Sequence, residues 1–140
     1  MALFPSPEWV EEMRKVAESD PEYKKAGADW EGDMIMVIEA EPGKLDQPFM
    51  YYSKPYKGEM LEYYQLKNEN ERTAEYTIRA PYSVIKGIIK GEIDPLQAMM
   101  KGKIKVKGNM QKLLKYAKFQ QLGMKALAKV KTEFVDEVKK

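Results

Sequence analysis

The sequence predicts an α+β fold in which a five-stranded, mostly antiparallel sheet is covered on one face by helices. Three observations lead to this prediction. Four short segments rich in aromatic and aliphatic residues follow one another across short turns, as strands of an antiparallel sheet do. Segments with helical periodicity precede and follow them. A fifth segment, residues 101–107, carries lysine at every second position, which is typical of a strand with one solvated face.

A helix is expected near the N-terminus because capping residues precede an amphipathic stretch. Ser6 is a candidate N-cap, Pro7 suits the first helical position, and acidic residues follow in the first turn. The apolar face of this helix is expected to consist of Trp9, Val10, Met13, Val16 and Ala17. A second short helix should run from Pro21 to about residue 26 and stop at Gly27.

Four strands are expected over residues 34–40, 47–54, 59–66 and 73–79. The turn sequences EPGK, PYKG and NENE separate them, and connections this short favour antiparallel neighbours. The tyrosines in these strands are Tyr51, Tyr52, Tyr63, Tyr64 and Tyr76. An inward hydroxyl could meet the headgroup of a ligand, although a strand tyrosine more often packs its ring and turns its hydroxyl to water.

Helical periodicity returns after Pro81. One helix should carry Tyr82, Ile85, Ile88 and Ile89 on a single face and end at Gly91. Asp94 and Pro95 should cap and start a second helix with the apolar stripe Leu96, Met99 and Met100. After the strand over 101–107, Asn109 should cap a final helical region that extends to about residue 138, with a break near Gly123 as an alternative.

The fifth expected strand has two chemically different sides. Its lysines, at 101, 103, 105 and 107, should face outward, while Ile104 and Val106 should face the helices. A lysine row also protects an edge strand from pairing with another chain, so this pattern needs no ligand to explain it.

Composition excludes most kinds of catalysis. The chain of 140 residues is 44% hydrophobic, which is enough for the core of one domain, and it has no cysteine and no histidine. Disulfides, thiolate nucleophiles and imidazole bases or metal ligands are therefore excluded. Glu92 and Asp94 could form an acid pair, but Asp94 is better explained as a cap. We expect no catalytic residue, no metal and no cofactor, and hence not an enzyme.

The charge is divided unevenly along the chain. Residues 1–80 hold 10 basic and 17 acidic side chains, whereas residues 81–140 hold 14 basic and 5 acidic ones. The basic half could approach anionic membranes or nucleic acid, or its lysines could simply be solvated. No signature of a nucleic-acid-binding fold accompanies them, so no nucleic acid is expected. The absence of a signal peptide and of a long apolar run favours a cytoplasmic location.

One stretch of the sequence resembles a known family. Residues 74–115, AEYTIRAPYSVIKGIIKGEIDPLQAMMKGKIKVKGNMQKLLK, are similar in order and spacing to the core signature of the sterol carrier protein type-2 family. The resemblance implies a sheet and helices that enclose an apolar tunnel for fatty acids, acyl-CoA, sterols or other lipids, which are bound without being transformed. The ten methionines suit variable apolar contents, although methionine also fills ordinary cores.

The order of the expected elements, the amphipathic terminal helix and the resemblance together predict a domain layout and a set of lipid-binding residues. One lipid-binding domain is expected over 1–140, with a helical extension over 1–27, four strands over 34–79, and helices plus the fifth strand over 81–140. The expected lipid-binding residues are Ile85, Ile88, Ile89, Leu96, Met99, Met100, Met110, Leu113, Leu114, Leu122 and Leu127. The terminal helix should act as a movable cover of the tunnel. Two alternatives remain: a binder of nucleic acid or anionic surfaces, and an accessory subunit that presents lipid to an enzyme.

Overall fold

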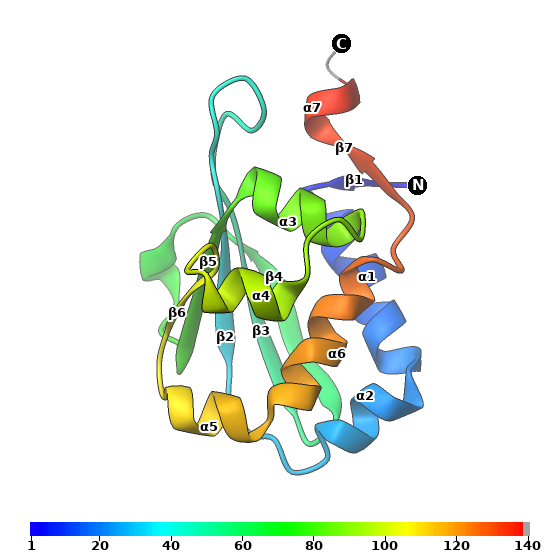
Figure 1. Ribbon diagram of the computed structural model, residues 1–140, viewed down its shortest axis with the longest axis vertical. Coiled ribbons are helices and arrows are strands. Elements are labelled where there is room, and N and C mark those ends of the chain that lie inside the picture. The colour runs from blue at the N-terminus through cyan, green and yellow to red at the C-terminus, as the bar shows by residue number, and fades with distance from the viewer. Residues whose placement is uncertain (139–140) are drawn as a thin grey trace.

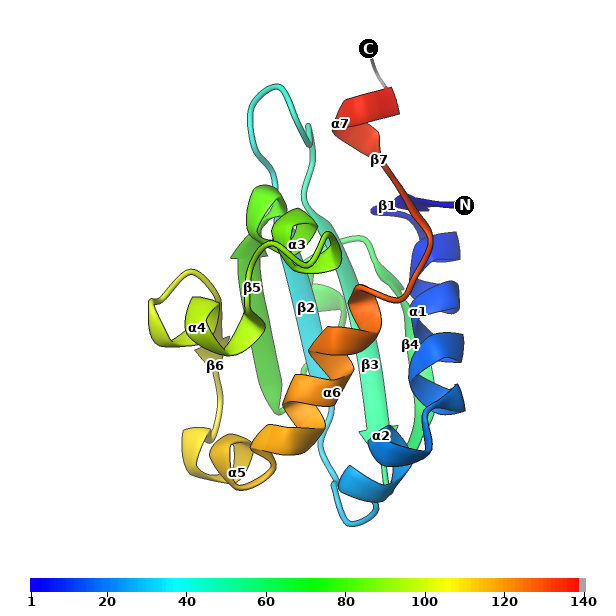
Figure 2. The ribbon, with the colours of Figure 1, turned by 45° about the vertical axis from the view of Figure 1, so that its right-hand side comes forward.

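A computed structural model describes residues 1–138 of the protein and contains two sheets. The larger one has five strands in the order β4-β3-β2-β5-β6. Its strands are β2 (Met34–Glu39), β3 (Phe49–Tyr56), β4 (Glu59–Leu66), β5 (Tyr76–Pro81) and β6 (Lys105–Lys107). Helices lie over one face of this sheet (Figures 1 and 2). The predicted α+β class, with five mostly antiparallel strands covered on one side, is confirmed.

The helices and the smaller sheet come from both ends of the chain. The helices are α1 (Pro7–Ser19), α2 (Pro21–Ala26), α3 (Tyr82–Ile89), α4 (Pro95–Met100), α5 (Met110–Lys115), α6 (Ala117–Leu127) and α7 (Val135–Val138), with a 3-10 helix η1 (Glu69–Glu71). The smaller sheet pairs β1 (Ala2–Phe4) with β7 (Thr132–Phe134) in parallel. None of the helices within residues 1–138 has the length and apolar character needed to cross a bilayer.

The pairing of the central strands differs in one place from the expected antiparallel series. Strand β2 pairs antiparallel with β3 but parallel with β5. The NENE segment is therefore not a hairpin turn, as the sequence suggested. Residues 67–75 form a crossover with η1 that carries the chain from β4, at one edge, past β3 and β2. The prediction was wrong here because the length of a connection does not reveal which strand it leads to.

Strand alternation gives the sheet two apolar faces of unequal size. Met36 and Ile38 of β2 belong to the large core beneath the helices, whereas Ile35 and Val37 face the other way. On that outer face they form a smaller buried cluster with Met50, Tyr52 and Leu66. Ala74, from the β4–β5 crossover, packs against this cluster. The crossover thus shields a face that the helices leave open.

The predicted N-terminal helices are confirmed together with their caps. The Ser6 Oγ accepts a hydrogen bond from the Trp9 backbone N–H at 3.1 Å, and Pro7 is the first residue of α1. Asp20 caps α2, and Gly27 follows its last residue. The buried side of α1 consists of Trp9, Val10, Met13 and Ala17, so this helix contributes to the main core.

The lysine-rich segment is shorter as a strand than expected. Only β6 is extended, because residues 101–104 fold back onto α4, where the Lys103 N–H donates to the Ala98 carbonyl at 2.8 Å. The predicted sidedness is confirmed: Ile104 is 2% exposed, whereas the lysines at 101, 103, 105 and 107 are exposed. Strand β6 pairs only with β5 and is the edge of the sheet, so its lysines discourage pairing with another chain.

The expected long terminal helix is divided, and Gly123 is not where it breaks. Helix α6 continues through Gly123, whereas Tyr116 separates α5 from α6 with φ −106° and ψ 34°. The Tyr116 ring packs edge-on against Trp30 at 5.3 Å between centroids, which accounts for a bend at this residue. Beyond α6 the chain becomes extended and pairs with β1, so the helix predicted to reach residue 138 ends at Leu127.

Candidate functional site

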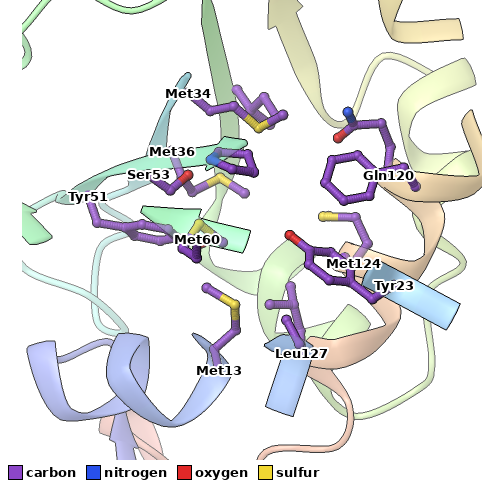
Figure 3. Close-up of a pocket in the computed structure, with 15 residues that line it drawn as sticks. Met13, Tyr23, Met34, Met36, Tyr51, Ser53, Met60, Gln120, Met124 and Leu127 are labelled. Atoms are coloured by element: carbon purple, nitrogen blue, oxygen red, sulfur yellow. The ribbon is translucent and has the colours of Figure 1, made fainter. Parts of the chain in front are cut away.

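A cavity lies between the helix-covered face of the sheet and helices α1, α2 and α6 (Figure 3). We call it the inner cavity. Its lining residues are Met13, Ala17, Tyr23, Met34, Met36, Tyr51, Ser53, Pro55, Met60, Ile78, Phe119, Gln120, Gly123, Met124 and Leu127. The lining combines both ends of the chain with the central strands, so it forms only when the whole domain is folded.

The alternation of side chains along a strand and the periodicity of an α-helix determine which side chains reach the inner cavity. In β2 and β3, alternate residues point toward the helices, which brings Met34 and Met36 beside Tyr51 and Ser53. In α6 the lining residues are Phe119, Gln120, Gly123, Met124 and Leu127, and their recurrence at intervals of three and four residues marks one helical face. Figure 3 shows the sheet residues and the α6 residues facing each other across the cavity.

The lining is apolar and uncharged. Five of its fifteen residues are methionine, and none is aspartate, glutamate, lysine or arginine. Its polar groups are the hydroxyls of Tyr23, Tyr51 and Ser53 and the amide of Gln120. Burial raises the pKa of Tyr51 above its ordinary value, with a smaller contribution from Tyr23, and burial likewise raises the pKa of Tyr23. Both phenols therefore stay protonated and can donate hydrogen bonds at any physiological pH.

The inner cavity is small in comparison with typical ligand pockets. Its volume is about 80 Å³, whereas pockets for drug-sized ligands span roughly 300–1,000 Å³. A long-chain ligand would have to displace side chains or shift a helix. Methionine suits such a lining because its unbranched side chain has several rotatable bonds and adapts to irregular neighbours.

A second apolar hollow adjoins the first on the other side of α6. This outer groove, of about 40 Å³, is lined by Pro95, Leu96, Met99, Leu113, Leu114, Ala117, Gln120, Gln121 and Met124. Gln120 and Met124 line both spaces. They form the partition between the two, so movement of these two side chains would connect them.

The residues expected to bind lipid occupy five different environments. Leu127 lines the inner cavity, and Leu96, Met99, Leu113 and Leu114 line the outer groove. The isoleucines of α3, at 85, 88 and 89, are buried in the main core. Leu122 is half-buried against the cluster that contains Trp30. Met110 is exposed, and Met100 is 79% exposed at the end of α4.

Several cavity residues were not among those expected, although the sequence held a signal for some. Met34 and Met36 alternate in a strand and Met124 lies in the expected terminal helix, so alternation and the high methionine content could have nominated them. Tyr23 had no such signal, because α2 had no predicted position relative to the sheet. Its ring packs on Phe119 at 4.8 Å between centroids, a contact between segments nearly one hundred residues apart.

Comparison with known proteins identifies the fold and the family. The model of the SCP-2 sterol transfer family matches residues 13–121, well over half of the chain. The chain belongs to the SCP-2 sterol transfer family. The resemblance carried by residues 74–115 is thereby confirmed and extended to α1 and to all strands of the larger sheet. No curated protein sequence matches the chain significantly.

Solved structures agree with the SCP-2 assignment. A crystal structure of sterol carrier protein 2 is 23% identical, with a TM-score of 0.78, and the match covers 89% of this chain and 97% of that one. A conserved hypothetical protein from Thermus thermophilus is 22% identical, with a TM-score of 0.77 and coverage of 91% and 90%. Palmitated SCP2L2 from Aedes aegypti is 14% identical, with a TM-score of 0.57 and coverage of 79% and 88%. These likenesses show a shared SCP-2 fold, and SCP-2 membership assigns the chain to the general class of lipid-binding and lipid-transfer proteins.

Proposed function

We propose that the protein is a non-catalytic carrier that binds a single-chain lipid, or a similarly elongated apolar molecule, in the inner cavity. The observation that carries this proposal is the methionine-rich, uncharged lining between sheet and helices, which shares Gln120 and Met124 with the outer groove. Palmitated SCP2L2 from Aedes aegypti offers a precedent for a fatty acyl chain held by this fold.

Apolar burial supplies the affinity in this proposal. Each methylene of the ligand that is removed from water contributes about 0.8 kcal/mol to the binding free energy. Part of this gain is lost because a cavity of only about 80 Å³ has to widen to admit the ligand. The SCP-2 chain holds two features that lower this cost. The methionines can change rotamer, and Gly123 leaves one turn of α6 without a side chain where the helix faces Tyr23. Helix α6 is the movable wall, while the pairing of β7 with β1 holds the segment after it.

A leucine at position 123 tests the location of the site. Its side chain would reach into the inner cavity, so Gly123→Leu should reduce the binding of an uncharged fluorescent single-chain lipid probe at least tenfold. Lys125→Leu is the matched control, because it adds the same side chain at an exposed position of the same helix. Equal binding by the two variants would place the lipid elsewhere, and a wild-type protein that binds no probe at micromolar concentration would overturn the carrier proposal.

The surface around the outer groove suggests where lipid is exchanged. Leu96, Met100 and Leu114 are exposed beside it. Lys101 and Lys118 are adjacent in sequence to residues of this apolar surface, and Lys103 follows two residues after Lys101. All three lysines are exposed, and in the described part of the chain they form no ion pair. We propose that this apolar surface touches anionic membranes during exchange. A lysine near such a surface contributes about 1 kcal/mol, which salt weakens.

A vesicle-transfer assay tests the membrane contact. Charge reversal at 101, 103 and 118 should slow lipid transfer to anionic vesicles about tenfold or more at low salt, with little effect on neutral vesicles. Reversal of Lys15, Lys44 and Lys67 is the control, because it changes the net charge equally at exposed positions outside the outer groove. Transfer rates indifferent to salt and vesicle charge would contradict the membrane contact. Strong salt-dependent binding to single-stranded DNA would favour a nucleic-acid binder instead.

A further inference from the structure

Four polar side chains of the inner cavity have no hydrogen-bond partner among residues 1–138. Tyr23, Tyr51 and Ser53 are 4%, 6% and 7% exposed and line the cavity, and within these residues their hydroxyls form no hydrogen bond. The Nε2 atom of Gln120 is buried and also unpaired. Within the described residues, the Gln120 Nε2 atom is the member of this group that is closed to solvent and unpaired, which is rare in folded proteins, whereas the three hydroxyls reach the space of the cavity. Unsatisfied groups of this kind often mark a place where a ligand completes the hydrogen bonds.

The four groups come from opposite walls and converge. Tyr51 and Ser53 are alternate residues of β3, on the sheet side, while Tyr23 and Gln120 belong to α2 and α6. Figure 3 shows the Tyr23 hydroxyl and the Gln120 amide directed from the helices toward the sheet. The influence of Tyr23 on the pKa of Tyr51 is consistent with two hydroxyls that face the same space. Together they offer hydroxyl and amide donors, and oxygens that accept.

The absence of charge in the lining selects the kind of group that can be bound. No acidic or basic side chain lines the inner cavity. An ionised carboxylate or a phosphate would therefore be buried without a counter-charge, which is far less favourable than burying a neutral group of the same size. A hydroxyl or an un-ionised carbonyl group would need only the hydrogen bonds that the four side chains can supply.

We infer that the inner cavity holds the uncharged polar end of a single-chain lipid, such as an alcohol, with its apolar tail passing Gln120 and Met124 into the outer groove. This inference rests on the proposed carrier function and adds an orientation and a head chemistry to it. The outer groove suits a tail because its only polar lining residues are Gln120 and Gln121. Ordered water in the cavity is the competing explanation, since about 80 Å³ would hold roughly two water molecules.

The test compares three twelve-carbon ligands that differ only at one end. Dodecanol, dodecanoic acid and dodecane would each displace an uncharged fluorescent polyene from the full-length protein. We expect dodecanol to bind at least tenfold more tightly than dodecane. Dodecanoic acid should bind weakly at neutral pH and gain affinity as the pH falls and its carboxyl group takes up a proton, while the affinity of dodecanol stays constant.

Two variants link that preference to the named groups. Gln120→Met keeps the length of the side chain and removes the amide, and Ser53→Ala removes one hydroxyl. Each should weaken dodecanol binding about three- to tenfold and leave dodecane unaffected, and thermal unfolding would show that both variants are folded. Equal binding of all three ligands, or equal losses for dodecanol and dodecane, would overturn the inferred head chemistry and favour the water explanation while the carrier function stands. If no ligand displaced the polyene, both proposals would fall.

Discussion

Replacing Gly123 with alanine should stabilise the protein. Gly123 lies inside α6, where glycine costs about 0.8–1.0 kcal/mol relative to alanine. A Cβ atom at this position would lie 3.5 Å from the Tyr23 Cε1, which is an ordinary van der Waals contact. The gain in helix propensity is therefore not lost to a clash. We expect the free energy of unfolding to rise by about 1 kcal/mol and the melting temperature by about 3–5 °C.

A second helical glycine provides a matched comparison. At Gly87, in α3, a Cβ atom would lie 2.4 Å from the Ile93 Cδ1 and 2.7 Å from its Cγ1. Overpacking of this kind costs about 1–3 kcal/mol and offsets the same gain in propensity. In urea denaturation Gly123→Ala should therefore be more stable than Gly87→Ala by about 1–3 kcal/mol. If Gly123→Ala destabilised the protein, or if both variants shifted equally, the described surroundings of these glycines would be incorrect.

Three further predictions concern stability. Burial tends to raise the pKa of Asp136, but hydrogen bonds from Tyr82 and Lys86 hold this pKa below the ordinary value of 3.8. The ionised carboxylate therefore stabilises the fold at neutral pH. In an acid titration the wild type should lose this contribution as the pH falls below 3.8, whereas Asp136→Asn should show no such loss. Trp30 is fully buried among three aromatic neighbours, so Trp30→Ala should lower the unfolding free energy by about 3–5 kcal/mol in urea denaturation. Thr132→Val removes the acceptor of a 3.0 Å hydrogen bond from α1 and should cost about 1–2 kcal/mol by thermal unfolding, whereas Thr132→Ser should cost less.

The features that could be predicted from the sequence are those fixed by neighbouring residues. Ser6, Asp94 and Asn109 each cap a helix through a side-chain bond to a backbone N–H three residues later, so their role is visible in a short window. The strand over 59–66 was also predicted with its observed bounds. Local propensity and turn chemistry were sufficient for these elements.

The features that could not be predicted depend on contacts between distant segments. The bend at Tyr116 follows from its contact with Trp30, which lies more than eighty residues earlier. The parallel pairing of β2 with β5 depends on where the chain crosses after β4, and neither strand's own sequence specifies its neighbour. Hydrophobic periodicity and composition do not indicate which distant segment a residue or strand will contact.

The residues of the candidate site likewise fall into those that the sequence predicted and those that depend on contacts between distant segments. The family signature over residues 74–115 pointed to the helices that line the outer groove. The inner cavity is built largely from residues outside that signature, such as Met36 and Tyr51, whose orientation depends on strand register. Recognition of the family was therefore enough to predict the fold, whereas the residues of the inner cavity and their polar groups required the packed structure.

The parallel pair of β1 and β7 has a consequence for how the protein is made. Ala2 pairs with Thr132, so β1 has to wait until about 130 further residues have been synthesised before its partner exists. At translation rates of 5–20 residues per second the delay is roughly 7 to 26 seconds. During that interval Phe4, which is fully buried in the finished protein, would be open to chaperones and proteases. A ribosome halted just before residue 132 would hold a nascent chain with every strand of the larger sheet already synthesised and its first strand still unpaired.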